Sequence, residues 1–196
     1  EIVGRWRQLE SDGDWTYFGV VVGQASTLGG STHIVPPREM PPDYAMSAIT
    51  KLTSALSLPV IVTGRINLPQ TAERILCAQE ADLCGMTRAL IADPDMPAKA
   101  IAGASDKIRV CIACNQACTG HGLSGFPISC IQYPECGRER TLGVKTRTDS
   151  SRRVGIVGGG PAGLQAGAIA ADSGHSVTPV PYPHLQLPPT GLREYT

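Results

Sequence analysis

The chain has 196 residues, enough for one large domain or two small ones. It carries 17 basic and 17 acidic residues, and this neutral balance leaves no electrostatic footprint for nucleic acid. No apolar run is long enough to span a bilayer, and the N-terminus lacks a charged-then-apolar targeting pattern, so we expect a cytoplasmic protein that contacts neither nucleic acid nor membrane.

Residues 1–103 are predicted to alternate short apolar strands with helices. The run at 17–22 is continuous and rich in β-branched residues, as in a strand covered on both faces. Asn67 is predicted to cap a helix that has Pro69 in its first turn. Alternation at this spacing is typical of parallel βαβ units. The expected elements are strands at 17–22, 59–63 and 82–85, a loop at 23–42, and helices at 44–56 and 67–80.

Two loops in this first segment each carry an arginine directly after a predicted strand. In a parallel α/β barrel the carboxyl ends of the strands form the active-site face, and the last two strands commonly supply a phosphate site. An arginine in each loop suits that role, because its guanidinium binds phosphate with forked hydrogen bonds. The alternative is that both arginines pair with nearby acids such as Asp93 and Asp95. The two loops are Gly64-Arg65 and Thr87-Arg88.

Residues 104–150 have little regular periodicity and contain four cysteines in the pattern Cys-x2-Cys-x3-Cys-x11-Cys. Such crowding of thiols in a polar, glycine-rich stretch is typical of an iron–sulfur cluster. Structural zinc is an alternative, although it usually presents two separate Cys-x2-4-Cys pairs. Disulfides or free thiols are another, although the chain has an odd number of cysteines, seven. The candidate ligands are Cys111, Cys114, Cys118 and Cys130.

The three other cysteines are not assigned as ligands. Cys136 lies just past the fourth candidate and is interpreted as a spare thiol. Cys77 falls in a predicted helix and Cys84 in a short apolar strand, and both are expected to be buried small hydrophobes. The polar run at 138–153 is predicted to be a linker.

The last segment, residues 151–196, begins with a predicted strand, a glycine loop, a helix and a second strand. A G-x-G-x-x-G loop between strand and helix indicates a dinucleotide-binding turn, and a glycine-rich turn without a ligand is the alternative. Pro181 stands where an acidic residue would hold a ribose hydroxyl, so this domain is expected to be cut short. The strands are expected at 153–157 and 175–180, and the glycines are Gly158, Gly160 and Gly163.

Four motifs in this order resemble the multidomain relatives of old yellow enzyme, the group that includes 2,4-dienoyl-CoA reductase and trimethylamine dehydrogenase. The resemblance covers roughly residues 1–180. In that family an FMN-binding (β/α)8 barrel is followed by a [4Fe–4S] cluster and then by a dinucleotide-binding domain. That domain holds FAD and often NAD(P)H, or ADP in the amine dehydrogenases. The motifs are PVIVTGRI, ADLCGMTRALIADPDMP, CIACNQAC with its return cysteine, and VGIVGGGPAG.

The resemblance implies an α/β chain in three parts. These are the last three βα units of an FMN-binding TIM barrel at 1–103, a [4Fe–4S]-binding segment and linker at 104–150, and a truncated Rossmann-like domain for FAD or ADP at 151–196. Gln24 falls near the family's substrate-pocket positions. By position, Gly64 and Arg65 match the strand-seven loop, with Arg65 at FMN, and Thr87 and Arg88 match the loop that holds the FMN phosphate. The cluster ligands are matched by Cys111, Cys114, Cys118 and Cys130. The pyrophosphate loop is matched by Gly158, Gly160 and Gly163.

The implied function is that of a flavin- and iron–sulfur-dependent oxidoreductase. Electrons would pass between a small-molecule substrate or NAD(P)H, FMN, the cluster and a second nucleotide domain or external carrier. An amine-oxidising or N-demethylating dehydrogenase is the alternative within the family, and a non-catalytic zinc-binding interaction module is one from another class. Three barrel units cannot close a barrel, and no catalytic acid or base is assigned. We therefore expect a fragment that is poorly stable and inactive by itself.

Overall fold

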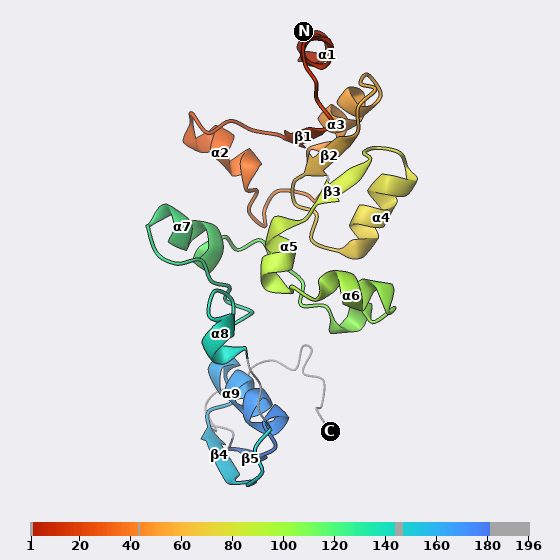
Figure 1. Ribbon diagram of the computed structural model, residues 1–196. Helices are drawn as coiled ribbons and strands as arrows, with labels where there is room; N and C mark the ends of the chain where they lie inside the picture. The colour runs from red at the N-terminus through yellow and green to blue at the C-terminus, as the bar shows by residue number, and fades with distance from the viewer. Residues whose placement is uncertain (1, 43, 144–146, 181–196) are drawn as a thin grey trace. The chain divides into compact units, whose positions relative to one another are not determined.

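The computed structural model describes residues 2–42, 44–143 and 147–180, and the chain divides into two compact units, residues 1–139 and 140–196 (Figure 1). The first unit is built on a three-stranded parallel sheet of order β1-β2-β3. Val21 pairs with Thr63, and Thr63 pairs with Gly85, so the three strands end at the same edge of the sheet. The strands are β1 (Phe18–Val21), β2 (Val60–Thr63) and β3 (Leu83–Gly85).

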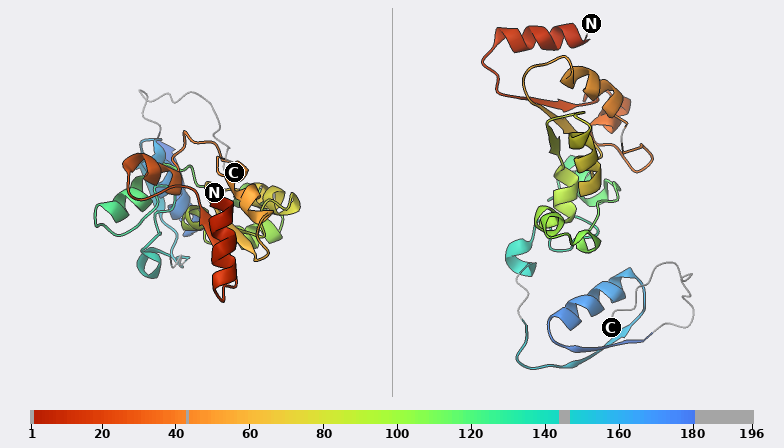
Figure 2. Two further views of the ribbon diagram at one scale, coloured as in Figure 1. Left: turned by 90° about the horizontal axis from the view of Figure 1, so that it is seen from above. Right: turned by 90° about the vertical axis from the view of Figure 1, so that its right-hand side faces the viewer.

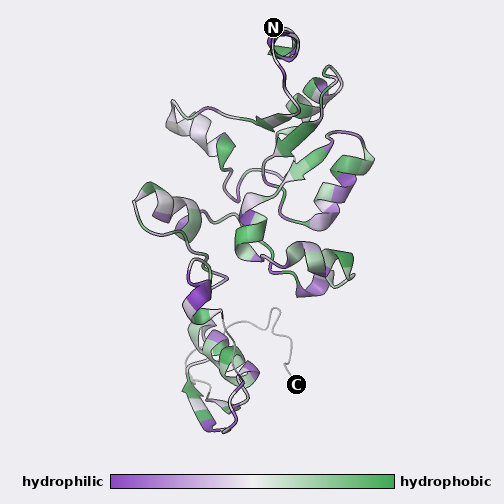
Figure 3. Cartoon of the chain, viewed as in Figure 1, coloured by the Kyte–Doolittle hydropathy of each residue, from purple (hydrophilic) through white to green (hydrophobic). Residues whose placement is uncertain are grey.

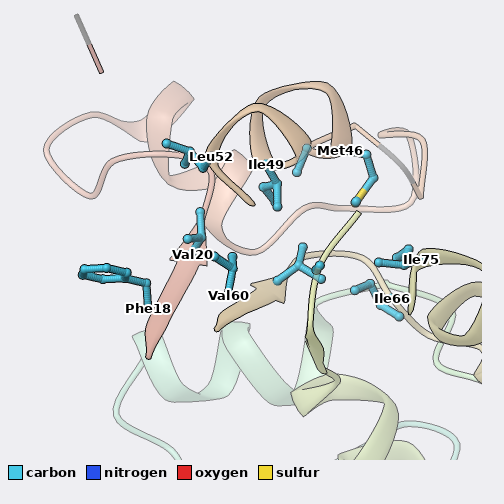
Figure 4. Packing of buried hydrophobic residues seen from close by; sticks show 11 residues of the cluster. Phe18, Val20, Met46, Ile49, Leu52, Val60, Ile66 and Ile75 are labelled. Carbon is cyan, nitrogen blue, oxygen red and sulfur yellow. The ribbon is translucent and has the colours of Figure 1, made fainter. Parts of the chain in front are cut away.

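The core of the first unit lies between this sheet and helix α3, Met46–Thr53 (Figure 4). Val60 and Val62 of β2 are 0% and 1% exposed, and Ile49 of α3 is 0% exposed. Alternate strand positions face the helix because successive side chains of a strand point to opposite faces. Each such side chain contributes about 1.5–3 kcal/mol through burial. Figure 3 shows β1 and β2 coloured as hydrophobic along most of their length.

Helices cover and extend the sheet of the first unit. Helix α1 was not foreseen from the sequence, and the carboxylate of Glu10 holds it in place by accepting hydrogen bonds from the Ser57 and Leu58 amides at 2.8 Å each. Trp6 of the same helix packs edge-on against Phe18, with 5.1 Å between ring centroids. The helices are α1 (Ile2–Asp12), α2 (Leu28–Ile34), α4 (Pro69–Cys77), α5 (Thr87–Ala92), α6 (Met96–Ile101) and α7 (His121–Leu123), with short turns η1 (Ser105–Lys107) and η2 (Gln116–Gly120). Helix α8 (Glu139–Leu142) spans the boundary between the two units.

The predicted strands and helices of residues 1–103 are present, with bounds that differ by at most three residues, and two details need correction. The segment predicted as a loop at 23–42 contains α2, whose first turn is capped by the Thr27 hydroxyl accepting from the Gly30 amide at 3.0 Å. Asn67 does not cap α4, because the helix begins at Pro69 with Leu68 as the capping residue. The predicted linker at 138–153 likewise contains α8.

The second unit is a small parallel βαβ arrangement. Helix α9 (Pro161–Asp172) packs over both strands, β4 (Arg153–Val157) and β5 (Ser176–Val180) (Figure 2). Gly174, just after the end of the helix, has φ of 90°, a left-handed conformation that is typical of the residue following a helix. Val157 is 72% exposed, so this unit has little core of its own. Pro181, where the missing acid was expected, lies outside the described residues, and the three-part domain assignment remains a prediction.

Among the residues that the structure describes, none of the helices has the length and apolar character that a membrane crossing needs.

Candidate functional site

A cavity of about 660 Å³ lies at the carboxyl ends of the strands of the first unit, and we call it the strand-end cavity. The predicted phosphate-loop residues Gly64, Thr87 and Arg88 all line it, and so does Cys118 from the cysteine segment. The structure therefore gathers three of the four predicted loop residues at one place. The remaining wall is formed by residues 19–21, 34–35, 63, 91, 119, 122–123 and 128.

Glycine at position 85 leaves room for the side chain of Thr63 on the neighbouring strand. A Cβ on Gly85 would sit 2.5 Å from the hydroxyl oxygen of Thr63 on the neighbouring strand, a distance that side-chain carbons do not tolerate. Gly64 lies against the ring of Tyr44, whose hydroxyl donates a hydrogen bond to the His33 carbonyl. Burial raises the pKa of Tyr44, so this hydroxyl stays a donor at neutral pH.

Arg88 is half-buried at the wall of the strand-end cavity. Its Nη1 donates to the Pro36 carbonyl at 2.9 Å and to Oδ1 of Asn115 at 2.6 Å. Both bonds use a single nitrogen, and a guanidinium carries five N–H donors in all. Arg88 therefore keeps donor capacity for an anion such as phosphate, and its position is fixed before any ligand arrives.

Arg65 behaves differently from Arg88. Its Nη1 donates to the carbonyls of Arg38 and Met40, its Nε is buried without a protein partner, and it is not among the residues that line the strand-end cavity. Arg65 thus clamps the segment before α3, and its predicted contact with FMN stays a prediction.

Asp93 does not pair with Arg65 or Arg88, as one alternative expected, because its carboxylate is hydrogen-bonded to other residues. It is 1% exposed and accepts hydrogen bonds from Lys99 Nζ at 2.6 Å and from the Arg109 amide at 2.8 Å. Burial raises the pKa of this carboxyl, but the Lys99 and Arg109 hydrogen bonds outweigh burial and hold the pKa below its ordinary value. Asp93 is therefore a structural anion that ties α6 to the start of the cysteine segment.

The four predicted cluster ligands line one small cavity, which we call the cysteine cavity. All four are half-buried, and all seven cysteines of the chain are free, which contradicts disulfides and leaves free thiols as the other part of that alternative. Within the described residues, no group of three or more His, Cys, Asp or Glu side chains is arranged to hold a single metal ion. The cavity is lined by Arg88, Ile91, Cys111, Ile112, Cys114, Asn115, Ala117, Cys118, Ser129, Cys130, Ile131 and Gln132.

The backbone between the cysteines turns sharply so that their side chains share this cavity. Ala113 and Asn115 have φ of 54° and 57°, the left-handed region, which costs a non-glycine residue about 1–2 kcal/mol. The turn continues into η2, where the Gly120 amide donates to the Asn115 carbonyl at 2.8 Å. Strain of this kind persists only where the surrounding structure holds it, and it is typical of ligand-binding loops.

Two side-chain amides hold the start of the cysteine segment, one from outside the segment and one from within it. Asn67 donates to the Cys111 carbonyl at 2.7 Å, and Gln132 donates to the Val110 carbonyl at 2.8 Å. The Ala113 amide points at the Cys111 sulfur, 3.4 Å away, as a donor to a thiolate would. The segment is therefore anchored on both sides of the first cysteine.

The cysteine cavity suits an iron–sulfur cluster by its donor set. Burial raises the pKa of Cys111, and the nearby Cys118 and Cys130 raise it further, so the thiols resist becoming anions together without a cationic group between them. The cavity measures about 20 Å³, room for little more than one water molecule. Insertion of a cluster therefore requires the loops at 111–118 and 129–132 to spread.

The other cysteines fall outside this set. Cys136 is 8% exposed; burial and the neighbouring Cys130 raise its pKa. Cys84 is half-buried and packs against the core, close to the expectation. The expectation for Cys77 is wrong: it is exposed, and it donates to the Glu73 carboxylate at 3.3 Å, because its position on α4 faces away from the sheet.

The glycine loop of the second unit has the local geometry that its spacing predicts. Gly158 has φ of 107°, which allows the tight turn. A Cβ on Gly163 would lie 2.0 Å from the Gly158 carbonyl oxygen, so only glycine lets α9 pack this close to the loop. Space around Gly160 is open, with nothing within 4 Å of a Cβ placed there.

Sequence reasoning missed Asn115. Its side chain bridges Arg88 and the Val35 carbonyl, donating to the latter at 2.9 Å. The available signal was an asparagine directly after the second cysteine, since asparagine tolerates the left-handed backbone better than most residues.

Comparison with known proteins gives concordant matches. Residues 32–107 match the model of the NADH:flavin oxidoreductase / NADH oxidase family. A metal reductase of Desulforamulus reducens is 44% identical over 127 residues, 65% of this chain and 19% of the relative. An N,N-dimethylglycine/sarcosine dehydrogenase of Chromohalobacter salexigens is 37% identical over 166 residues, 83% of this chain and 24% of the relative.

Solved structures agree with these matches. A 2-naphthoyl-CoA reductase superposes with a TM-score of 0.80 at 26% identity, over 90% of this chain and 26% of its own. This structural likeness, together with the family match, supports the predicted α/β class. The chain thus spans between 19% and 26% of the length of these three proteins.

Proposed function

Because the chain belongs to the NADH:flavin oxidoreductase / NADH oxidase family, we propose that it provides the FMN-phosphate site and the cluster ligands of a flavin- and iron–sulfur-dependent oxidoreductase. The observation that carries the proposal is that the strand-end cavity and the cysteine cavity have lining residues in common. Arg88 and Cys118 line both the strand-end cavity and the cysteine cavity. A flavin phosphate and an inorganic cluster bound in these cavities would be immediate neighbours.

The residues of the strand-end cavity have distinct roles in this proposal. Arg88 binds the FMN phosphate through the free part of its guanidinium, and the Thr87 hydroxyl donates a further hydrogen bond. Gly64 lets the ligand approach the backbone at the end of β2. Arg65 supports the FMN site through the segment at 38–40, which it clamps. When bound, FMN supplies two-electron chemistry and the cluster supplies one-electron transfer.

The cluster would be a [4Fe–4S] centre held by Cys111, Cys114, Cys118 and Cys130. Four thiolates around one cavity form the ligand set that such a cluster uses. The Ala113 amide, 3.4 Å from the Cys111 sulfur, supplies a hydrogen bond of the kind that tunes a cluster's potential.

The second unit would bind a nucleotide, FAD or ADP, at the loop with Gly158, Gly160 and Gly163. The left-handed turn at Gly158 and the open space at Gly160 support this assignment, since a pyrophosphate needs close access to the backbone. NAD(P)H would be the electron donor or acceptor.

Two reactions fit these sites: reduction of an unsaturated small molecule, and oxidation of an amine with N-demethylation. Relatives of both kinds match the chain, a 2-naphthoyl-CoA reductase and an N,N-dimethylglycine/sarcosine dehydrogenase. We favour the reductase type, because the spacing Cys-x3-Cys before Cys118 resembles the dienoyl-CoA reductase form. Reduction of the bound flavin by NADPH, rather than by a methylated amine, is the expected outcome, and bleaching by the amine alone would reverse the choice.

Because three barrel units are expected to be inactive by themselves, the proposal is tested on the protein at its natural length, purified without exposure to air, by measuring FMN, iron and acid-labile sulfide per chain. We expect about one FMN, four iron and four sulfide. Zinc in place of iron would favour a zinc-binding interaction module instead.

Replacing Arg88 by alanine should lower FMN affinity at least tenfold while iron content stays constant. Arg74 serves as the matched control, because it is an exposed arginine paired with Glu80 at 3.1 Å. Unchanged FMN affinity in Arg88→Ala would remove Arg88 from the site.

A further inference from the structure

The side chain of Asn115 joins three segments that are far apart in the sequence. Its Oδ1 accepts from Arg88 Nη1 at 2.6 Å, and its Nδ2 donates to the Val35 carbonyl at 2.9 Å. Its own backbone carbonyl accepts from Gly120 at 2.8 Å. One residue of the cysteine segment therefore contacts α5, the end of α2 and the turn η2 that carries Cys118.

Both ends of the amide are used, so neither aspartate nor leucine can make both of its hydrogen bonds. An aspartate of the same shape would keep the acceptor for Arg88 but would face the Val35 carbonyl with an oxygen in place of the N–H. A leucine would remove both bonds. The left-handed backbone, with φ of 57°, further favours asparagine, aspartate or glycine at this position.

We infer that Asn115 is a positioning residue that sets the guanidinium of Arg88 for the flavin phosphate from within the cysteine segment. This inference rests on the function proposed above. Within the part of the chain that the structure describes, the Pro36 carbonyl is the one other acceptor of Arg88 Nη1, so without Asn115 the guanidinium can rotate away from the strand-end cavity. The consequence is that occupation of the flavin site depends on the fold of the loop that holds the cluster.

The test compares FMN with riboflavin, which lacks the phosphate, as ligands of the anaerobically purified holoprotein after its flavin is removed. Asn115→Gly keeps the left-handed backbone and deletes the amide. We expect it to weaken FMN binding about tenfold, the effect of one charge-assisted hydrogen bond, and to leave riboflavin binding within about twofold. Asn115→Asp should weaken FMN further, because a carboxylate next to Arg88 offsets its positive charge.

A double-mutant cycle shows whether the effect passes through Arg88. In the Arg88→Ala background, Asn115→Gly should cause no further loss of FMN affinity. Asn67→Ala is the matched control: it removes an amide that holds the same cysteine segment through the Cys111 carbonyl. This control should leave the ratio of FMN to riboflavin affinity unchanged.

The outcomes separate this inference from the proposed function. If Arg88→Ala weakens FMN binding and Asn115→Gly does not, Asn115 has no positioning role and the proposed function stands. Equal weakening of FMN and riboflavin in Asn115→Gly would also overturn the inference, because it indicates general damage to the fold. If Arg88→Ala leaves FMN affinity intact, both the phosphate assignment and this inference are wrong.

Discussion

Replacing Asp93 by alanine should destabilise the first unit by about 3 kcal/mol. The carboxylate is 1% exposed and accepts hydrogen bonds from Lys99 Nζ at 2.6 Å and from the Arg109 amide at 2.8 Å. Breaking one partner of a buried charge pair costs about 3–5 kcal/mol. We expect the lower end of this range, because the Lys99 side chain is 28% exposed and can turn into water. The Arg109 amide belongs to the backbone and cannot turn into water in the same way.

Urea unfolding followed by circular dichroism measures the global cost, and hydrogen–deuterium exchange at 105–111 measures the local one. Exchange should accelerate there because the Arg109 amide loses its acceptor at the entrance to the cysteine segment. Asp106→Ala is the control, since Asp106 is exposed on η1. A loss below about 1 kcal/mol in Asp93→Ala would refute the assignment of Asp93 as a structural anion.

The same residue predicts a pH dependence. The pKa of Asp93 is lower in the folded chain than in the unfolded chain, so its stabilisation is fully present above the unfolded value of about 3.9. It is lost as the pH falls through the folded pKa. The difference in unfolding free energy between the wild type and Asp93→Ala should therefore be constant near neutral pH and shrink below about pH 4. A difference that grows on acidification would contradict the sign of the shift.

Three further substitutions test other parts of the chain. Gly163→Ala should destabilise the second unit by about 1–3 kcal/mol, because its methyl carbon would lie 2.0 Å from a backbone oxygen. Gly155→Ala is the control and should not destabilise the unit, because the space around this position is open. Hydrogen exchange of residues 153–180 compares the two variants. Ile49→Ala removes a side chain that is 0% exposed and should cost about 2–5 kcal/mol in urea unfolding. Cys130→Ala should abolish iron binding in elemental analysis, while Cys77→Ala, at an exposed position, should retain it.

Periodicity and turn residues predict most of the fold because they report on local chemistry. The predicted strand at 59–63 consists of a proline followed by a continuous β-branched run, and the structure places β2 on that run, Val60–Thr63, in the centre of the sheet. Helix α1 escaped prediction because its stability comes from distant partners. Glu10 reaches the Ser57 and Leu58 amides 47 and 48 residues away, and no local pattern encodes such contacts.

For the candidate site, spacing predicts which residues gather but not how they are bonded. The four cysteines share a cavity, and Thr87 and Arg88 share another, as the motifs suggest. The partners of the two arginines follow from tertiary structure alone. Arg65 turns to the carbonyls of Arg38 and Met40, and Arg88 finds an amide in the cysteine segment. Arg65 and Arg88 follow neighbouring strands at corresponding places in the sequence pattern, yet their side chains have different hydrogen-bond partners and therefore different roles.

The strand order β1-β2-β3 places β1 and β3 at the two edges of the sheet. Edge strands present backbone donors and acceptors that can pair with strands of other molecules. Val21 and Leu83 on these strands are 43% and 49% exposed, so the edge strands also present apolar side chains that favour association. Concentrated solutions of this polypeptide should therefore assemble through intermolecular β-pairing, with light scattering that rises steeply with concentration, and dilute handling will be needed to keep it dispersed.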